Sequence, residues 1–370
     1  MKIEEFTLER VQSLYENTVD YNLTESGFHP FSLKEVLSEK EIHSLLSLPL
    51  GYGHTNGSEE LRDRISTYYP RTDRSRILVT NGSSEANFLV IWSLLDSGDE
   101  LLLMQPNYQQ IYGLARSFGI RVKPFFLKEE FHWQPDIKEI KKQTSSKVKM
   151  IALCNPNNPT GSVLDKEIRK EIIEIARDMD AWIYCDEIYR GSEVGQKETA
   201  SFWGEYDKVI VNGGLAKSYS LPGLRLGWLV GPVDIIDSAW SYHDYTTISP
   251  NLLSQKIASY VLLPRIRERI RERNRALLRK NLQMVTDWIA SHRDLFFMIP
   301  PQAGATTFIH HTLEISSQEL TEKLRKQKSV FMVQGECFNM ENFIRLGIGS
   351  KTSYLQQGLK LFDQWLKEYS

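Results

Sequence analysis

The strongest constraint on the fold of this chain is a repeated alternation between short apolar runs and helix-length segments. The runs have the length and aliphatic character of buried strands, and they lie at residues 76–80, 100–104, 149–154, 181–186, 208–212 and 226–230. The segments between them carry the apolar spacing of helices. From Glu59 to Val230 this alternation predicts a mainly parallel sheet covered by helices, the doubly wound α/β class.

A second unit of different character follows Pro250. Residues 252–290 predict one or two long helices. Strands are then predicted at 296–300, 305–311, 329–333 and 343–349, with helices at 317–326 and 352–368. The chain of 370 residues is therefore expected to form a large α/β domain and a smaller one.

The charge balance offers no whole-molecule attraction for nucleic acid or for an anionic membrane, because 45 Lys and Arg residues face 47 Asp and Glu residues. The basic stretch 265–280 keeps apolar residues at helical spacing, which favours a solvated helix over a nucleic-acid site. No run of about 18 apolar residues predicts a membrane span. The acidic start MKIEEFTLER does not resemble a leader, so we expect a cytoplasmic protein.

No metal site is predicted. Cys154, Cys185 and Cys337 lack CxxC spacing, and the first two lie in apolar, strand-like runs, as buried reduced thiols do. None of the eight histidines forms an HExxH pair.

A lysine in the run NGGLAKSYSLPGLRLGW, residues 212–228, is the sharpest chemical signal. Lys217 follows a buried strand and a glycine pair, and another apolar strand comes soon after. This context puts it at a carboxyl end of the sheet, where ligands bind in open α/β folds. A desolvated amine there is a candidate Schiff-base nucleophile.

Three further motifs follow predicted strands. NPNNPTG, residues 155–161, has the composition of a turn that stiffens the edge of the sheet. AWIYCDEIY, residues 181–189, ends a buried strand on Asp186, a carboxylate that needs a cationic partner such as a protonated ring nitrogen. TNGSSEAN, residues 80–87, leads into a helix N-terminus, which favours either an anion or an ordinary serine cap.

Together these motifs resemble those of the class I/II aminotransferases, the pyridoxal-phosphate enzymes of fold type I. The resemblance runs from GYGHTNGSEELR at 51–62 to FIRLGIG at 343–349, through NPxNPTG, DExY and KxxxxPGLRLGW. It implies a large domain with a mainly parallel seven-stranded sheet and a smaller α/β domain. The expected division is an N-terminal arm with part of the small domain at 1–45, a large PLP-binding domain at 46–260 and a small C-terminal domain at 261–370.

The resemblance also implies a role for each matching residue. Lys217 would form the aldimine with pyridoxal 5'-phosphate, Asp186 would pair with the ring nitrogen, and Tyr189 and Asn158 would contact the ring hydroxyl. Tyr108 would stack on the ring. The cofactor phosphate would lie on Gly82, Ser83, Ser84 and Arg225, whose planar guanidinium suits phosphate oxygens.

The remaining implied roles concern the substrate and the assembly. Arg345, in the strand FIRLGIG, would clamp the substrate α-carboxylate together with Gly27 and Asn158. Tyr52 would reach the phosphate of a neighbouring subunit, which implies a homodimer. The expected small-molecule partners are an amino acid and a 2-oxo acid.

Two positions depart from the family pattern. Gly214 stands where many members have a phosphate-binding serine, so we expect Ser218 or water to substitute. Tyr245 stands where members selective for acidic substrates have an arginine. We therefore expect a pocket without a distal arginine, lined by aromatic and polar groups near Phe28, Tyr108 and Tyr245.

The resulting functional prediction is amino transfer between an amino acid and a 2-oxo acid. The alternative is a lyase or a cyclising synthase of the capreomycidine synthase type, because the runs SGFHPF and SEANF also resemble such a synthase. A regulator with a degenerate aminotransferase domain is disfavoured, since about fifty residues before the first sheet motifs are too few for a helix-turn-helix module and the N-terminal arm. GYGHTNG fails as a dinucleotide site, because Asn56 replaces the third glycine.

Overall fold

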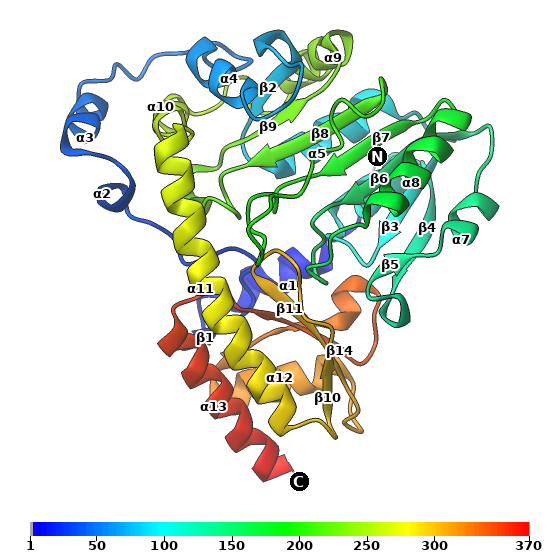
Figure 1. Ribbon diagram of the computed structural model, residues 1–370, viewed down its shortest axis with the longest axis vertical. Coiled ribbons are helices and arrows are strands. Elements are labelled where there is room, and N and C mark those ends of the chain that lie inside the picture. The colour runs from blue at the N-terminus through cyan, green and yellow to red at the C-terminus, as the bar shows by residue number, and fades with distance from the viewer. Residues whose placement is uncertain (1–2, 370) are drawn as a thin grey trace.

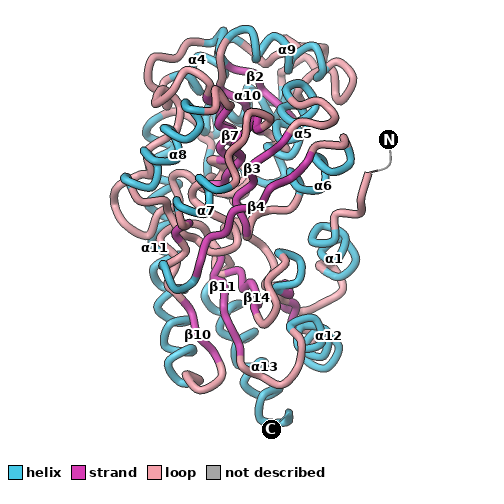
Figure 2. The backbone as a smooth tube through the Cα atoms, turned by 90° about the vertical axis from the view of Figure 1, so that its right-hand side faces the viewer, coloured by secondary structure: helices cyan, strands magenta, loops and turns pink. Residues whose placement is uncertain are grey.

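Two sheets organise residues 3–369, which a computed structural model describes (Figure 1). The larger sheet lies in the upper part of Figure 1 and a four-stranded sheet in the lower part. The long helix α11, Pro264–Ser291, runs beside both parts. A view turned by 90° shows helix α1, Thr7–Tyr15, at the level where the two parts meet (Figure 2).

The large sheet has the strand order β2-β9-β8-β7-β6-β3-β4-β5. Its strands are β2 Ile77–Thr80, β3 Glu100–Gln105, β4 Arg121–Lys128, β5 Gln134–Pro135, β6 Val148–Cys154, β7 Trp182–Asp186, β8 Val209–Gly214 and β9 Gly227–Val230. The five central strands from β8 to β4 pair in parallel, and β9 is antiparallel to both of its neighbours. The predicted mainly parallel sheet is confirmed. Seven strands form its body, and the two-residue β5 adds an eighth at one edge.

Helices cover both faces of this sheet because successive strand residues point to opposite sides. In β7, Ile183 and Cys185 pack in one apolar cluster, which includes residues of α8, and Tyr184 packs in another, which includes residues of α5. The helices of this part are α4 Glu59–Ser66, α5 Ser83–Leu94, α6 Gln110–Ser117, α7 Ile137–Lys142, α8 Lys166–Asp178, α9 Val233–His243 and α10 Leu252–Val261, with short 3-10 turns η1 Arg74–Arg76, η2 Glu129–Phe131 and η3 Pro222–Leu224.

Strand β4 is the one long strand of the large sheet that patterning does not single out. Its run RVKPFFLK contains Pro124, and a proline argues against a central strand because it has no N–H to donate. In the structure Pro124 pairs with β3 on one side, while β5 reaches only Leu127 and Lys128 on the other. The proline is therefore tolerated near the edge of the sheet.

The lower part contains the four-stranded antiparallel sheet and the helices that cover it. Its elements are β10 Phe296–Met298, β11 Thr306–His311, α12 Ser317–Lys328, β12 Val330–Phe331, β13 Val333–Gln334, η4 Gly335–Phe338, β14 Phe343–Gly347 and α13 Thr352–Tyr369, and the N-terminal residues add β1 Tyr21–Asn22. Helices α2 Leu33–Val36 and α3 Glu39–Leu46 lie higher, beside α10 and α11 (Figure 1). The predicted strand 329–333 divides at Met332: β12 pairs with β1, and β13 pairs with β14. Within residues 3–369, no helix has the length and apolar character needed to cross a bilayer.

The N-terminal segment after β1 packs directly on the backbone of the lower sheet. The Gly347 N–H donates to the Leu23 carbonyl at 2.7 Å, and the His29 N–H donates to the Gly349 carbonyl at 2.7 Å. A Cβ added at Gly347 would lie 2.3 Å from the carbonyl oxygen of Glu25. The glycines of FIRLGIG therefore allow a close approach between residues far apart in sequence.

We predict that Gly347→Ala lowers stability by about 1–3 kcal/mol, because the new methyl group must displace packed backbone. Gly195→Ala is the matched control, since a Cβ there meets no atom within 4 Å. Chemical unfolding of both variants measures the difference. Equal denaturant midpoints for Gly347→Ala and Gly195→Ala would show that the close contact between Gly347 and the N-terminal segment does not contribute to stability.

Candidate active site

A cavity of about 480 Å³ opens at the carboxyl edge of the large sheet. It is lined by residues from the turns after the strands, from the start of α5, from α1 and from β14. The residues predicted from the sequence that line it are Ser83, Ser84, Tyr108, Asn158, Asp186, Tyr189, Lys217, Arg225 and Arg345. Within residues 3–369, no group of His, Cys, Asp or Glu side chains is arranged to hold a metal ion.

Lys217 follows β8 by three residues and projects into this cavity. Its Nζ donates to Ser26 Oγ at 2.8 Å. Loss of water around the amine lowers the pKa of Lys217 from its ordinary value. A Cβ added at Gly27 would lie 3.2 Å from the Ala216 carbonyl and 3.6 Å from Lys217 Cδ, so the backbone of Gly27 lies against the lysine side chain.

Asp186 is the last residue of β7 and is 94% buried. Burial raises the pKa of its carboxyl group to about 6, although hydrogen bonds from the Ile188 N–H and from the amides of Asn212 and Asn87 act in the opposite direction. The two amides also bond to each other at 2.9 Å. The carboxylate is thus oriented by neutral donors, and the charge of Lys217 also lowers its pKa.

Arg345 lies in the middle of β14 and is 99% buried. Its Nη1 donates to Asn158 Oδ1 at 3.1 Å and its Nη2 to the Thr24 carbonyl at 2.7 Å, while its Nε has no partner. Burial lowers the pKa of this guanidinium. Tyr189 is also buried, and burial raises the pKa of its phenol above the ordinary value.

The start of α5 and Arg225 form a site suited to an anion. Ser83 and Ser84 begin the helix, and the first N–H groups of a helix have no intrahelical partner. Gly82 has a φ of 84°, and a Cβ there would lie 2.7 Å from Arg225 Nη2. A Cβ at Gly227 of β9 would lie 2.5 Å from the Ser83 nitrogen, so glycines let the strand, the helix start and the arginine come together.

Gly214 has no room for a larger side chain. Its Cβ would lie 2.8 Å from Ile188 Cδ1 and 3.1 Å from the Leu226 carbonyl. The expected substitute Ser218 is not part of the cavity lining, because it lies in a separate small hollow with Tyr68 and Tyr219. Ser83, Ser84 and Arg225 are then the polar side chains of this chain at the anion end.

Tyr108 connects the cavity wall to α1. Its hydroxyl donates to Glu9 Oε1 at 2.7 Å, and its ring meets that of Phe6 edge to face at 4.9 Å. Phe6 and Glu9 line the cavity as well. The N-terminal helix therefore forms part of the site.

Two expected site residues lie elsewhere in this chain. Tyr52 is 91% exposed and lines a surface hollow with Leu50 and Ile248. Tyr245 is 83% exposed, with its ring edge against Trp92, and neither it nor Phe28 lines the cavity. Of the expected pocket residues Phe28, Tyr108 and Tyr245, Tyr108 alone lines the cavity in the described chain.

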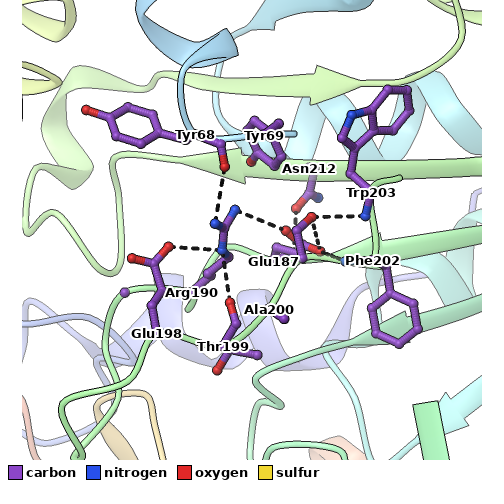
Figure 3. Close-up of polar contacts among 12 residues, drawn as sticks. Tyr68, Tyr69, Glu187, Arg190, Glu198, Thr199, Ala200, Phe202, Trp203 and Asn212 are labelled. Carbon is purple, nitrogen blue, oxygen red and sulfur yellow. Dashed lines mark hydrogen bonds and ion pairs between the residues drawn. The ribbon is translucent and has the colours of Figure 1, made fainter. Parts of the chain in front are cut away.

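Glu187, the residue after Asp186, belongs to an ionic network of its own (Figure 3). Glu187 accepts from the Phe202 N–H at 2.7 Å and lies 3.7 Å from Arg190. Arg190 also pairs with Glu198 at 3.0 Å and donates to the Tyr68 carbonyl at 3.2 Å. Because Glu187 precedes Tyr189 and Arg190 follows it, these contacts hold the Tyr189 loop in place at both ends.

Glu85, in the first turn of α5, holds the helix start against the segment after α9. Burial alone would raise the pKa of its carboxyl group, but hydrogen bonds from His243, Thr246 and the Asn81 N–H lower it to about 2. The Thr247 hydroxyl donates to the same carboxylate at 2.8 Å. Glu85 is thus a buried anchor beside the anion end of the cavity.

We predict an acid-dependent loss of stability from Glu85. Its folded pKa lies below the ordinary 4.5, so its contribution of about 3 kcal/mol is present above that value and is lost as the pH falls toward 2. The free energies of unfolding of wild type and Glu85→Gln, measured with urea, should differ most at neutral pH and become equal in acid. Glu314→Gln, on an exposed loop, is the control. A difference that stays constant with pH would contradict this assignment.

Three residues of the site lie within the runs SGFHPF, TNGSSEAN and NGGLAKSYSLPGLRLGW, but the sequence motifs give them no role. Ser26 contacts Lys217, and Asn87 and Asn212 orient Asp186. Asn212 interrupts an apolar strand and Asn87 an apolar helix, so a polar residue in an apolar run is the signal that could have found them. The residues of α1 gave no such signal.

Comparison with known families gives one match over most of the chain. The family described as aminotransferase class I and II matches residues 24–361. Among solved structures, a PLP-dependent aminotransferase from Streptococcus suis superposes with a TM-score of 0.94 at 31% identity, over 100% of this chain and 99% of that one.

Two curated relatives have lower identities. Capreomycidine synthase from Streptomyces vinaceus is 26% identical over 93% of this chain and 89% of its own length. A probable aspartate aminotransferase from Methanocaldococcus jannaschii is 28% identical over 90% of this chain and 87% of its own length.

Proposed function

The chain belongs to the class I and II aminotransferase family, and on that premise we propose that it transfers an amino group from an amino acid to a 2-oxo acid. The observation that carries the proposal is one cavity lined by a recessed lysine, a buried carboxylate and a buried arginine. These are Lys217, Asp186 and Arg345. Family membership and the PLP-dependent structural neighbour imply pyridoxal phosphate as the cofactor.

The residues of the cavity fit this cofactor. Asp186 is a buried carboxylate without an ion-pair partner within residues 3–369, which suits a protonated ring nitrogen. Arg225 and the free N–H groups of Ser83 and Ser84 suit a phosphate, whereas the Gly82 N–H donates to the Thr80 carbonyl at 3.0 Å. Tyr108 provides a ring face, and Tyr189 and Asn158 provide donors for a ring hydroxyl.

The bound cofactor supplies a carbonyl carbon and a ring that withdraws electrons from the substrate Cα. Lys217 Nζ holds the cofactor and, once free, takes the proton from Cα. Its lowered pKa suits this role, because a general base must be unprotonated near the working pH. Ser26 Oγ, 2.8 Å away, orients the amine.

Arg345 binds the substrate α-carboxylate. Its guanidinium is a buried cation in the cavity lining without an ion pair in residues 3–369, and a carboxylate is the group that complements it. Asn158 and the Thr24 carbonyl keep the guanidinium plane in place. Gly27 lets the backbone approach the substrate beside Lys217.

The second candidate is a PLP-dependent lyase or cyclising synthase. It is favoured by the relation to capreomycidine synthase, at 26% identity over 93% of the chain. Both reactions begin with the same loss of the Cα proton, and they differ in whether a side-chain substituent is then expelled.

Single-turnover reaction with a panel of amino acids tests the proposal. We expect the cofactor to change to its amine form and a 2-oxo acid to appear in equal amount. Asp186→Asn should retain the cofactor on Lys217, as borohydride reduction and peptide mapping would show. It should react at least about a hundredfold more slowly, a loss of about 2.7 kcal/mol, because its neutral amide no longer pairs with a protonated ring.

The outcomes separate the candidates. Ammonia release without the amine form would favour the lyase or synthase. Label on a lysine other than Lys217, or an unimpaired Asp186→Asn enzyme, would overturn the assignment of the site.

We propose a homodimer as the working assembly. Leu50, Tyr52 and Ile248 are 77%, 91% and 51% exposed and line one surface hollow, which is an unusual concentration of exposed apolar side chains. A second copy covering this face would bring Tyr52 near the cofactor phosphate of the other subunit.

Sedimentation should give twice the chain mass, and Tyr52→Ala should lose cofactor more readily without losing the fold. Phe297→Ala, an exposed aromatic residue of β10, should retain cofactor as wild type does. A monomer with full cofactor affinity would contradict the proposed assembly.

A further inference from the structure

Three glutamates line the same cavity at its mouth. Glu9 lies on α1, Glu16 directly follows that helix, and Glu25 lies in the segment packed on β14. Gln12 of α1 lines the cavity too. Because residues 9, 12 and 16 are spaced at i, i+3 and i+7, they occupy one helix face, and that face is turned to the cavity.

The position of these glutamates is determined by contacts with the site. Gln12 Nε2 donates to Thr24 Oγ1 at 2.9 Å, and the Thr24 carbonyl accepts from Arg345 Nη2 at 2.7 Å. Glu9 accepts from the Tyr108 hydroxyl at 2.7 Å. The acidic face of α1 is therefore linked to the residue that binds the substrate carboxylate.

The glutamates have no cationic partner in the described chain. Within residues 3–369, the Tyr108 hydroxyl supplies the only hydrogen bond to their three carboxylates, and no Lys, Arg or His forms an ion pair with them. Burial, followed by the charges of Glu25 and Glu9, raises the pKa of Glu16. Three carboxylates thus lie along one side of the cavity without a direct ion pair.

The opposite end of the cavity carries the complementary charge. Arg345 is 99% buried, lines the cavity and leaves its Nε without a partner. Glu9 and Glu25 line the same cavity as Arg345 and Lys217, and their charges act on the pKa values of both groups. The cavity therefore has a cationic end for a carboxylate and an anionic mouth.

We propose, on the basis of the function proposed above, that the preferred substrate is an amino acid whose side chain ends in an amino or guanidino cation. Arg345 holds the α-carboxylate, Lys217 faces Cα, and the side chain extends toward Glu16 and Glu25. An organic cation there relieves the repulsion among the carboxylates. Selectivity comes from charge at the mouth of the cavity.

Matched pairs of ligands test the proposal. L-arginine and L-citrulline have nearly the same shape and differ in charge, as do δ-guanidinovalerate and δ-ureidovalerate, which lack the amino group and cannot react. Calorimetry of the cofactor-loaded enzyme should show δ-guanidinovalerate binding at least about tenfold tighter, with the preference falling as salt rises. Single-turnover rates should rank arginine above citrulline by a similar factor.

The double variant Glu16→Gln, Glu25→Gln should lose this preference while reacting with neutral amino acids as wild type does. Glu314→Gln, Glu341→Gln removes the same charge from exposed positions outside the cavity and should keep the preference. Equal binding of the two valerates, or a preference that survives in the first double variant, would overturn the proposal. Failure of every amino acid to react would instead count against the proposed function.

Discussion

The burial of the Asp186 carboxylate at the end of β7 is the constraint on which the rest of the site depends. A carboxylate removed from water is destabilising unless hydrogen bonds or an opposite charge compensate it. The Ile188 N–H and the amides of Asn212 and Asn87 compensate it in part, yet its pKa stays raised to about 6. The fold thus buries a carboxylate whose charged form a cationic ligand would stabilise.

The neighbouring Glu187 shows the opposite solution. Its carboxylate, one residue along the chain, is matched by Arg190 and by the Phe202 N–H and the Ser201 hydroxyl, away from the cavity (Figure 3). One of two adjacent acids is therefore held by the protein, through hydrogen bonds to Oε1 and the Arg190 charge 3.7 Å from Oε2, and secures the loop of Tyr189. The other is left for a ligand, and this difference separates a structural charge from a functional one.

The cavity is completed by the lower part of the molecule and by the N-terminal segment. Gly347 and Gly349 let residues 23–29 lie against β14, and this contact brings Ser26 to Lys217 and Thr24 to Arg345. Helix α1 then closes one side through Gln12 and Glu9. The cofactor residues come mainly from the large sheet, whereas the charges that would select a substrate come from these added segments.

The sequence by itself determined the elements whose signals are local. Alternating apolar runs predicted the parallel sheet, and the ends of two runs singled out Asp186 and Lys217, because parallel strands bring their carboxyl ends to one edge. The roles of Asn158 and Arg225 came from the resemblance of their motifs to the family. Only the tertiary structure decided which distant residues join them. Ser26 meets Lys217 across 191 positions and Thr24 meets Arg345 across 321, and no local pattern records such pairs. In the sequence, Glu9, Gln12 and Glu16 are typical of an ordinary polar helix face. Periodicity identifies the face of a helix but not what it contacts, so only the packing of α1 shows that this face lines the cavity.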